Sequence, residues 1–576
     1  MLRLWRKNAR KMIALAVAAA VFGVAPATAS AQAPSTDAQT LQVLQALQQR
    51  LDQLENQNRN LQATVQQLQS APQAPVAGQP VSLGAPNDVR SVVNDVLKER
   101  DAAKSASELA AKKKAEDEGH VVGSNLNFAG RWKNGELWFE TPQKDFTFHL
   151  GGRVQYDVVG VQAGDNVMFG NGGFGQFDDA TNFRRARLTA QGTFWEIFNY
   201  TAEYDFLNTT QSDGPLTVTK NKAGVVTNVT ASQNTYNTPV PTDLWIEATQ
   251  IPWIGNVRVG NLKAPIGFEH YTSSRFLNFM ERSNMFDSFI ENGDNGFESG
   301  LMAYNWTEDQ RATGALSITK TTRNIFGWNV GDGEWGVTNR LTWLPVWEEN
   351  GRCFVHVGMG SQYRGADDQQ FRFRSRTELR NGPASLHTVV ARSQIQATEG
   401  QLLLQPEFVV QMGPFLLQSE FAYTEIDGVN KIIQTPTQTN VNISQRNYTS
   451  TGAYVEALYF LTGESRDYNK KLPGLGRVVP YRNAYWVRGE NGANIFSMGA
   501  WQVGLRYSYL NQNNNGINGA EINSWTFGLN WFLNPNFKIQ WNYETARRDV
   551  GTGVNNAFGN GSGNYQGVGV RFAFDF

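Results

Sequence analysis

The chain ends on the segment Gln566-Gly-Val-Gly-Val-Arg-Phe-Ala-Phe-Asp-Phe576, in which two kinds of side chain alternate without a break. Because successive side chains of a β-strand point to opposite sides, one side of this strand is apolar and the other is small or charged. Such a strand suits a boundary between lipid and a water-filled interior. A soluble β-sandwich can show the same alternation. An aromatic apolar face and a terminal Phe favour a membrane barrel.

The same alternation recurs upstream, in 146–158, 501–509, 525–533 and 537–544. Short links between these segments alternate with long polar ones, and eight long links predict about sixteen strands, an even number as in bacterial barrels. We therefore predict an all-β fold, a roughly 16-stranded antiparallel transmembrane β-barrel over 145–576. One segment, 463–494, is long where a short turn is expected, and we interpret it as a plug or rim element. The eight long links are 161–180, 209–240, 264–295, 321–333, 365–398, 427–448, 511–520 and 549–564.

The composition is compatible with a barrel and excludes several other classes. The 576 residues are 40% hydrophobic and 12% aromatic and include 55 glycines, and the mean hydropathy is −0.43. Beyond the N-terminus, no stretch approaches the roughly 20 apolar residues of a membrane-spanning helix. A formal net charge of −1 argues against nucleic-acid binding. Cys353 is the only cysteine, so neither an internal disulfide nor a cysteine-rich metal site is expected.

The first 120 residues differ in pattern from the rest. A basic, then apolar, then small-residue sequence predicts a signal peptide over 1–31, with a membrane anchor as the alternative. Leucines at alternating steps of three and four predict an N-terminal α-helical coiled-coil extension over 37–70, with a single helix packed on the barrel as the alternative. A Pro- and Gln-rich linker over 71–87 and a charged helical segment over 88–120 follow. Since an even strand count puts both barrel ends on the short-turn side, this arm is expected in the periplasm.

We find no catalytic motif in the sequence. The five histidines do not form the spacing H-E-x-x-H, and no G-x-S-x-G segment is present. We therefore expect no catalytic residue, no metal site and no cofactor. An outer-membrane hydrolase with a Ser and His distant in sequence is the alternative that this observation leaves open.

Several segments, taken in their order along the chain, resemble the phosphate-selective porin O/P family. The resemblance covers about 146–576 and lies in the spacing of these motifs more than in any one of them. The predicted N-terminal coiled coil lies outside this range and is a departure from the family pattern. The motifs are Gly152-Arg-Val-Gln155, Phe183-Arg-Arg-Ala-Arg-Leu188, Tyr204-Asp-Phe206, Val259-Gly-Asn-Leu-Lys-Ala-Pro265, Phe279-Met-Glu-Arg-Ser283, Tyr459-Phe-Leu-Thr-Gly-Glu464 and Gly528-Leu-Asn-Trp-Phe-Leu-Asn-Pro535.

The resemblance implies a trimeric porin of the bacterial outer membrane, with an inward loop at about 264–295 that narrows the pore. The expected function is passive diffusion of small hydrophilic solutes and ions, with a preference for anions such as phosphate. Rings of basic side chains select anions. Alternation points several arginines into the lumen, namely Arg153, Arg185, Arg187, Arg258 and Arg506, and an extended fifth long link would place Arg372, Arg374 and Arg376 on one face. Candidates in the inward loop are Lys263, Glu281 and Arg282.

Two other interpretations of these features stay open. Luminal arginines can brace the wall through salt bridges with acidic neighbours instead of contacting solutes. The arm can tether the barrel to a cell-wall component instead of serving only to assemble trimers. The expected partners are thus outer-membrane lipid, further copies of the chain, small anions, and the cell wall in the tether alternative.

Overall fold

The computed structural model describes residues 121–576 with internal gaps. The predicted signal peptide, coiled coil, linker and charged helix lie outside the described residues. The gaps are 134, 170–176, 208, 221–225, 238, 292–295, 321–334, 366–369, 381–388, 398, 433–440, 490–491, 515–516 and 551–560.

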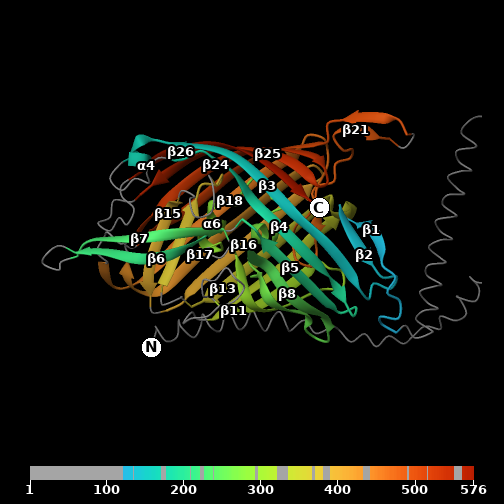
Figure 1. The fold of residues 1–576 in the computed structure, drawn as a ribbon, viewed down its shortest axis with the longest axis horizontal. Helices are drawn as coiled ribbons and strands as arrows, with labels where there is room; N and C mark the ends of the chain where they lie inside the picture. The colour runs from blue at the N-terminus through green and yellow to red at the C-terminus, as the bar shows by residue number, and fades with distance from the viewer. Residues whose placement is uncertain are drawn as a thin grey trace, which may run out of the picture. The chain divides into compact units, whose positions relative to one another are not determined.

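Sixteen antiparallel strands form a closed barrel, which confirms the predicted count (Figure 1). Each strand pairs with the next in the series, and the last returns to pair with the first. The strands are β3 (Thr147–Ala163), β4 (Ala180–Phe194), β5 (Phe198–Asp205), β8 (Val240–Ile251), β9 (Gly255–Lys263), β10 (Phe297–Trp306), β11 (Ala312–Lys320), β12 (Trp335–Glu348), β13 (Cys353–Arg364), β16 (Gln401–Met412), β17 (Phe415–Ile432), β18 (Val441–Phe460), β23 (Ala500–Asn514), β24 (Ile517–Asn534), β25 (Phe537–Asp549) and β26 (Gly563–Asp575).

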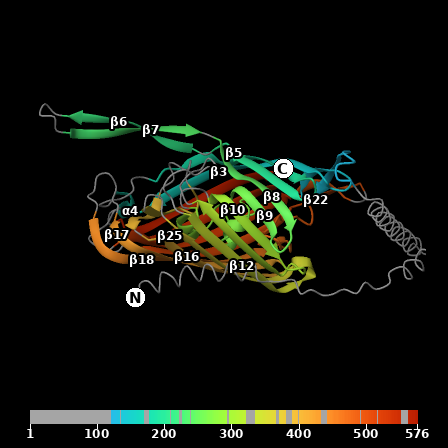
Figure 2. The same ribbon diagram turned by 90° about the horizontal axis from the view of Figure 1, so that it is seen from below.

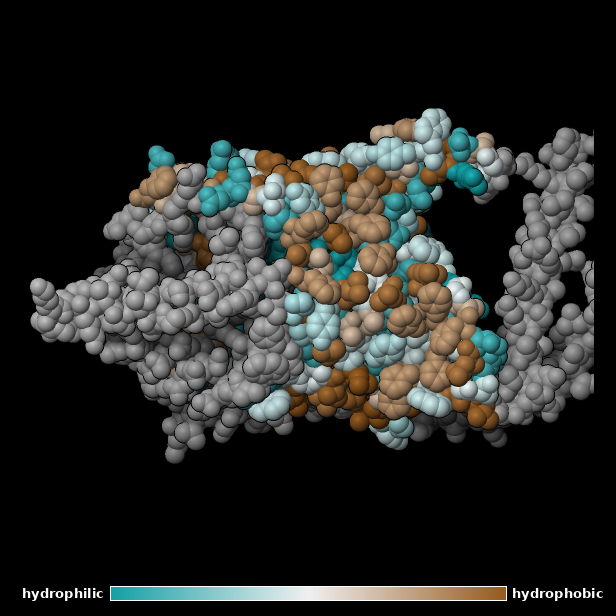
Figure 3. Space-filling model, in the orientation of Figure 1, coloured by the Kyte–Doolittle hydropathy of each residue, from teal (hydrophilic) through white to brown (hydrophobic). Residues whose placement is uncertain are grey.

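The terminal segment that predicts the fold closes the barrel. In β26, Phe572 and Phe574 are exposed on the outer face, whereas Arg571 and Ala573 are buried. The strand pairs with β3 from Tyr565, opposite Ala163, to Asp575, opposite Arg153. Apolar side chains gather over the middle of the outer wall (Figure 3). The lipid-facing alternation predicted from the sequence is therefore present.

Short turns join the strands at one rim, and long links join them at the other. The prediction of a long link at 511–520 is wrong, because β23 continues to Asn514 and β24 begins at Ile517. Link 427–448 is also mostly strand, since β17 reaches Ile432 and β18 begins at Val441. Both segments are rich in polar residues, and this composition led to the prediction of loops. Strands that extend beyond the bilayer need no apolar face.

Several elements inside or before the barrel were not predicted. A hairpin of β1 (Ala129–Lys133) and β2 (Glu136–Glu140) pairs with the start of β3. Long links contain α4 (Asp165–Phe169) and the hairpins β6 (Thr209–Lys220) with β7 (Val226–Asn237), and β14 (Gln370–Arg376) with β15 (Val389–Ala397). The β6–β7 hairpin projects away from the barrel wall (Figure 2). A short 3-10 turn, η1 (Glu349–Gly351), joins β12 to β13.

The long segment between β18 and β23, residues 461–499, occupies the short-turn rim. It contains two small hairpins, β19 (Tyr468–Asn469) with β20 (Gly474–Leu475) and β21 (Tyr485–Arg488) with β22 (Asn494–Ser497). Its first half reaches into the lumen, where the Leu475 backbone N–H donates to Thr272 Oγ1 and Arg340 donates to the Pro473 carbonyl. This position agrees with the interpretation of a plug or rim element.

One half of the lumen is packed with apolar side chains. The link from β9 to β10 folds inward and carries α5 (Phe268–Tyr271) and α6 (Asn284–Phe289). Phe289 of α6 and Phe373 of β14 are fully buried and pack edge to face at 5.8 Å. They belong to a cluster with inward side chains of β16–β18 and β23–β26. Among the described residues, no helix is long and apolar enough to cross a membrane.

Candidate functional site

A charged cavity of about 250 Å³ remains on the other side of the inward link. Its walls come from β3, β4, β5, β8, β9 and the start of β10, from the inward link, from the end of β14, and from the segment 461–499. A polar cavity of this size holds several water molecules. Its charged lining residues are Arg153, Arg184, Arg185, Arg187, Glu203, Asp205, Asp243, Arg258, Lys263, Arg282, Glu291 and Arg376.

Arginines of β3 and β4 are paired with carboxylates of β5 along the barrel wall. Arg187 Nε lies 2.7 Å from Asp205 Oδ2, and its Nη1 lies 3.0 Å from Glu203 Oε1. Arg153 donates to the same Glu203. These residues are cross-strand neighbours, because Arg187 is opposite both Arg153 and Asp205 in the sheet. Alternation along three strands therefore builds a ladder of ion pairs.

Arg258 of β9 extends this ladder. Its Nη2 lies 2.8 Å from Glu247 Oε2 on the neighbouring strand β8. Its guanidinium also lies 3.6 Å from the ring centroid of Trp245, a cation–π contact that fixes its plane.

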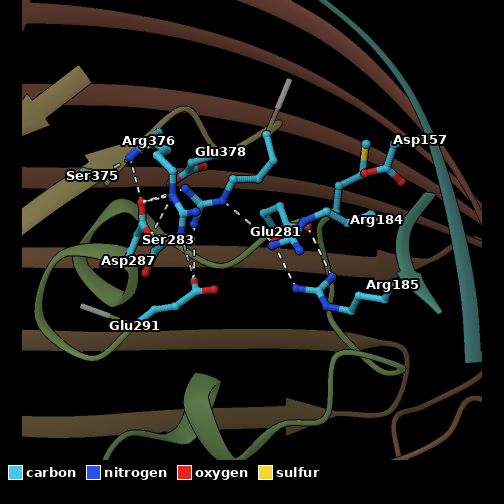
Figure 4. Close-up of polar contacts among 12 residues, drawn as sticks. Asp157, Arg184, Arg185, Glu281, Ser283, Asp287, Glu291, Ser375, Arg376 and Glu378 are labelled. Carbon is cyan, nitrogen blue, oxygen red and sulfur yellow. Dashed lines mark hydrogen bonds and ion pairs between the residues drawn. The ribbon is translucent and has the colours of Figure 1, made fainter. Parts of the chain in front are cut away.

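Glu281 of the inward link accepts three arginines and attaches this link to the wall. Arg184 and Arg185 lie 3.0 and 3.2 Å from its carboxylate (Figure 4). Arg571 of β26 lies 2.6 Å from the same carboxylate. Opposite Gln155 and Tyr156 of β3, strand β4 has a β-bulge in which Arg184 is the extra residue, so two successive arginines point inward. Burial alone would raise the pKa of Glu281, but these arginines hold that pKa well below its usual range.

A second carboxylate of the inward link, Asp287 in α6, binds the β14 hairpin. Arg376 Nη2 and Arg380 Nη1 each lie 2.6 Å from one of its oxygens (Figure 4). Burial opposes the charge of Asp287, but the two arginines outweigh burial and lower its pKa. The inward link is thus held by ion pairs at both the wall and the hairpin.

Lys263 and Arg282 differ from the arginines of the ladder. Lys263 Nζ donates to the His270 carbonyl at 3.0 Å, and Arg282 donates to the Glu269 and Thr272 carbonyls at 2.9 and 2.7 Å. Within the part of the chain that the structure describes, no carboxylate lies within 4 Å of either cation. Both cations are thus hydrogen-bonded to backbone carbonyl groups at the cavity and are not paired with a carboxylate.

The cavity therefore carries a surplus of positive charge. Eight of its lining residues are Lys or Arg and four are Asp or Glu. His270 adds no charge, because burial and then the neighbouring cations Lys263 and Arg282 lower its pKa well below the usual value. Arginine and lysine donors in a small water-filled space can bind an oxyanion through charge-assisted hydrogen bonds.

The structure divides the residues predicted from the sequence between two places. Arg153, Arg185, Arg187, Arg258, Arg376, Lys263 and Arg282 line the cavity, and Glu281 lies directly behind it. Arg506 does not line it, because Arg506 is buried in the packed half with Glu378 at 2.5 Å. Arg372 and Arg374 lie on β14 and are not among the lining residues.

Sequence reasoning missed Arg184, Arg380 and Arg571 as partners of the inward link. Alternation did place Arg571 on the inner face of the last strand, so a signal for it existed. Arg184 owes its position to the bulge, which alternation alone cannot predict. Arg380 follows β14 in a link that the sequence left unassigned.

A closed barrel with a lipid-facing outer wall and a charged luminal cavity defines a membrane channel protein. The family described as phosphate-selective porin O and P matches residues 148–576, and the chain belongs to this family. It is thus an outer-membrane channel for the passive diffusion of small hydrophilic solutes and ions, and not an enzyme.

Individual relatives are more distant. Porin O of Pseudomonas aeruginosa is 24% identical over 446 residues, covering 73% of this chain and 87% of the relative. An uncharacterized protein of Caulobacter vibrioides is 24% identical over 414 residues, covering 70% of each chain. Among solved structures, the anion-selective porin from Comamonas acidovorans is 11% identical with a TM-score of 0.39, covering 75% of this chain and all of that one.

Proposed function

We propose that this channel prefers small anions, with phosphate as the characteristic oxyanion, and that they pass through the cavity beside the inward link. The observation that carries this proposal is the excess of eight basic over four acidic lining residues. A fixed positive charge raises the local concentration of anions and repels cations from a narrow passage.

The paired and unpaired cations have different roles in this mechanism. Arg153 and Arg187 share Glu203, so they contribute little net charge, although their donor groups face the cavity. Lys263 and Arg282 supply the net charge that attracts an anion. A planar guanidinium can donate two parallel hydrogen bonds to a phosphate, so the arginine ladder offers successive sites for a dehydrating oxyanion.

Reversal potentials across a chloride gradient in planar bilayers test this proposal. We expect the wild-type protein to be anion-selective, and Lys263→Gln to lower the anion-to-cation permeability ratio about fivefold, equivalent to about 1 kcal/mol for one charge at close range. Lys144→Asn is the matched control, because Lys144 is exposed outside the cavity and has a left-handed backbone that Asn tolerates. Cation selectivity of the wild-type channel would contradict the proposal.

We also propose that the channel is a homotrimer in outer-membrane lipid with its N-terminal arm in the periplasm. The heptad pattern of 37–70 supports an oligomeric arm, and the even strand count supports its periplasmic side. The cell-wall tether alternative concerns this same arm. Native mass spectrometry of the full chain and of a variant lacking 37–118 tests the arm's role. Trimers that persist without the arm would show that it does not direct assembly.

A further inference from the structure

The hairpin β21–β22 carries an exposed aromatic pair that the channel function does not use. Trp486 is 70% exposed and Phe496 is 52% exposed. They lie directly opposite each other in the hairpin and pack edge to face at 5.5 Å. Large apolar side chains are seldom this exposed in water without a partner.

This hairpin is attached to the lipid-facing wall at the short-turn rim. The Trp501 and Trp531 indole N–H groups both donate to the Met498 carbonyl, at 3.1 and 2.6 Å. The Ala484 backbone N–H donates to the Leu533 carbonyl at 2.6 Å, and the Tyr485 ring lies 5.9 Å from that of Trp531.

The tryptophans that hold the hairpin belong to the outer wall. The Trp501 ring stacks on Trp531 of β24 and on Trp541 of β25, with centroid distances of 5.0 and 6.4 Å. On the same face of β24, Trp525 and Phe527 are about half exposed. Tryptophan is enriched at membrane–water interfaces. The hairpin extends past the ends of the barrel strands (Figure 1). Its aromatic pair therefore continues the aromatic belt of the wall.

The charge of the hairpin fits a phospholipid surface. Arg488 lies on the same face as Trp486, two residues further along the strand, and Arg482 precedes the hairpin; both are exposed. Among the described residues, neither has a carboxylate within ion-pair distance. An amphipathic element that carries aromatic side chains and neighbouring arginines on one face is suited to the headgroup region of a bilayer. There, the aromatic rings insert between lipids and the arginines bind lipid phosphate.

We propose that residues 484–489 and 492–498 form a lipid-binding foot, whose Trp486 and Phe496 insert into the phospholipid leaflet at the short-turn rim while Arg482 and Arg488 bind headgroup phosphates. A two-stranded hairpin is marginally stable in water by itself. Burial of its free face in lipid would stabilise it and would fix the rim of the barrel at the membrane surface.

Nitroxide accessibility in the full-length protein tests this proposal. In a Cys353→Ala background, Phe496→Cys is labelled and reconstituted in vesicles of phosphatidylethanolamine and phosphatidylglycerol. The controls are Phe527→Cys on the lipid-facing wall and Glu308→Cys, which is exposed in a short turn of the same rim. We expect the nitroxide at 496 to collide with a water-soluble nickel chelate roughly threefold less often than the nitroxide at 308. We also expect it to collide with oxygen, as a nitroxide at the membrane interface would.

Two results would overturn the proposal. If the label at 496 is as accessible to the nickel chelate as the label at 308, the face of the hairpin is exposed to water and does not insert into lipid. A label protected from both oxygen and nickel would show that protein, such as a second copy of the chain, covers it. If the Phe496→Cys variant fails to fold, Trp486→Cys on the same face is measured instead and must give the same ordering.

Discussion

The two halves of the lumen contain similar charged residues but use them differently. In the packed half, Arg506 is buried against Glu378, and at its boundary with the cavity Arg376 and Arg380 share Asp287. These ion pairs hold the elements that form the apolar cluster in position. In the open half, the ladder arginines are paired too, but Lys263 and Arg282 donate their hydrogen bonds to backbone carbonyl groups. The comparison indicates that an inward-facing arginine is not in itself a selectivity residue. Lys263 and Arg282 differ in combining a position at the cavity with the absence of a paired carboxylate.

The largest expected effect comes from removing the carboxylate that joins the two halves. Glu281→Gln leaves three buried arginines without their shared partner, and breaking a buried pair of this kind typically costs about 3–5 kcal/mol. We expect a lower free energy of unfolding in denaturant titrations, and stronger anion selectivity in channels that still assemble. Glu308→Gln, at an exposed turn, is the control and should change neither. Unchanged stability of Glu281→Gln would show that the inward link is held by other contacts.

A smaller but clear effect is expected from truncating one aromatic ring in the packed half. Phe373→Ala opens a cavity where the side chain is fully buried, which should lower the free energy of unfolding by about 3–4 kcal/mol. Phe527→Ala makes the same change on the lipid-facing wall, where lipid fills the space, and should cost at most about 1 kcal/mol. Thermal unfolding of both variants in detergent measures the difference. Equal losses would contradict a packed luminal core.

The smallest expected effect is that of pH. The pKa values of Glu281 and Asp287 lie below their ordinary values near 4, so their stabilising contribution is fully present above about pH 5 and is lost only as pH falls further. His270, with a lowered pKa, stays neutral over the same range. Reversal potentials at pH 6 and pH 5 should therefore agree. A marked rise in anion preference at pH 5 would reveal a titrating carboxylate at the cavity.

Much of the barrel was predictable from the sequence, because alternation with a period of two directly reports which face of a strand meets lipid. Alternation in 566–576 and 525–533 located β26 and β24. It failed where strands leave the bilayer, as at 511–520, and inside long links, where the hairpin β14–β15 has its own apolar face. Side chains such as Leu403 and Ile522 point inward yet are apolar, because the packed half of the lumen covers them.

The candidate site was predictable only in part. Alternation indicated which arginines face the lumen, but their partners come from distant segments. Arg506 meets Glu378, and Arg571 meets Glu281, which lies 290 residues away in sequence. Which cation remains unpaired depends on these tertiary contacts. For Lys263 and Arg282, no local sequence signal distinguishes them from the paired arginines.

The most direct test of the central claim is chemical modification of single cysteines during conduction. In a Cys353→Ala background, Lys263→Cys places a thiol in the open half, and Ser393→Cys places one in the packed half, where Ser393 is buried. We predict that a negatively charged methanethiosulfonate reagent reacts at 263 and reduces anion current, and that it leaves the variant at 393 unchanged. Reaction at 393 together with no reaction at 263 would contradict the account, because ions would then pass through the half that we describe as packed.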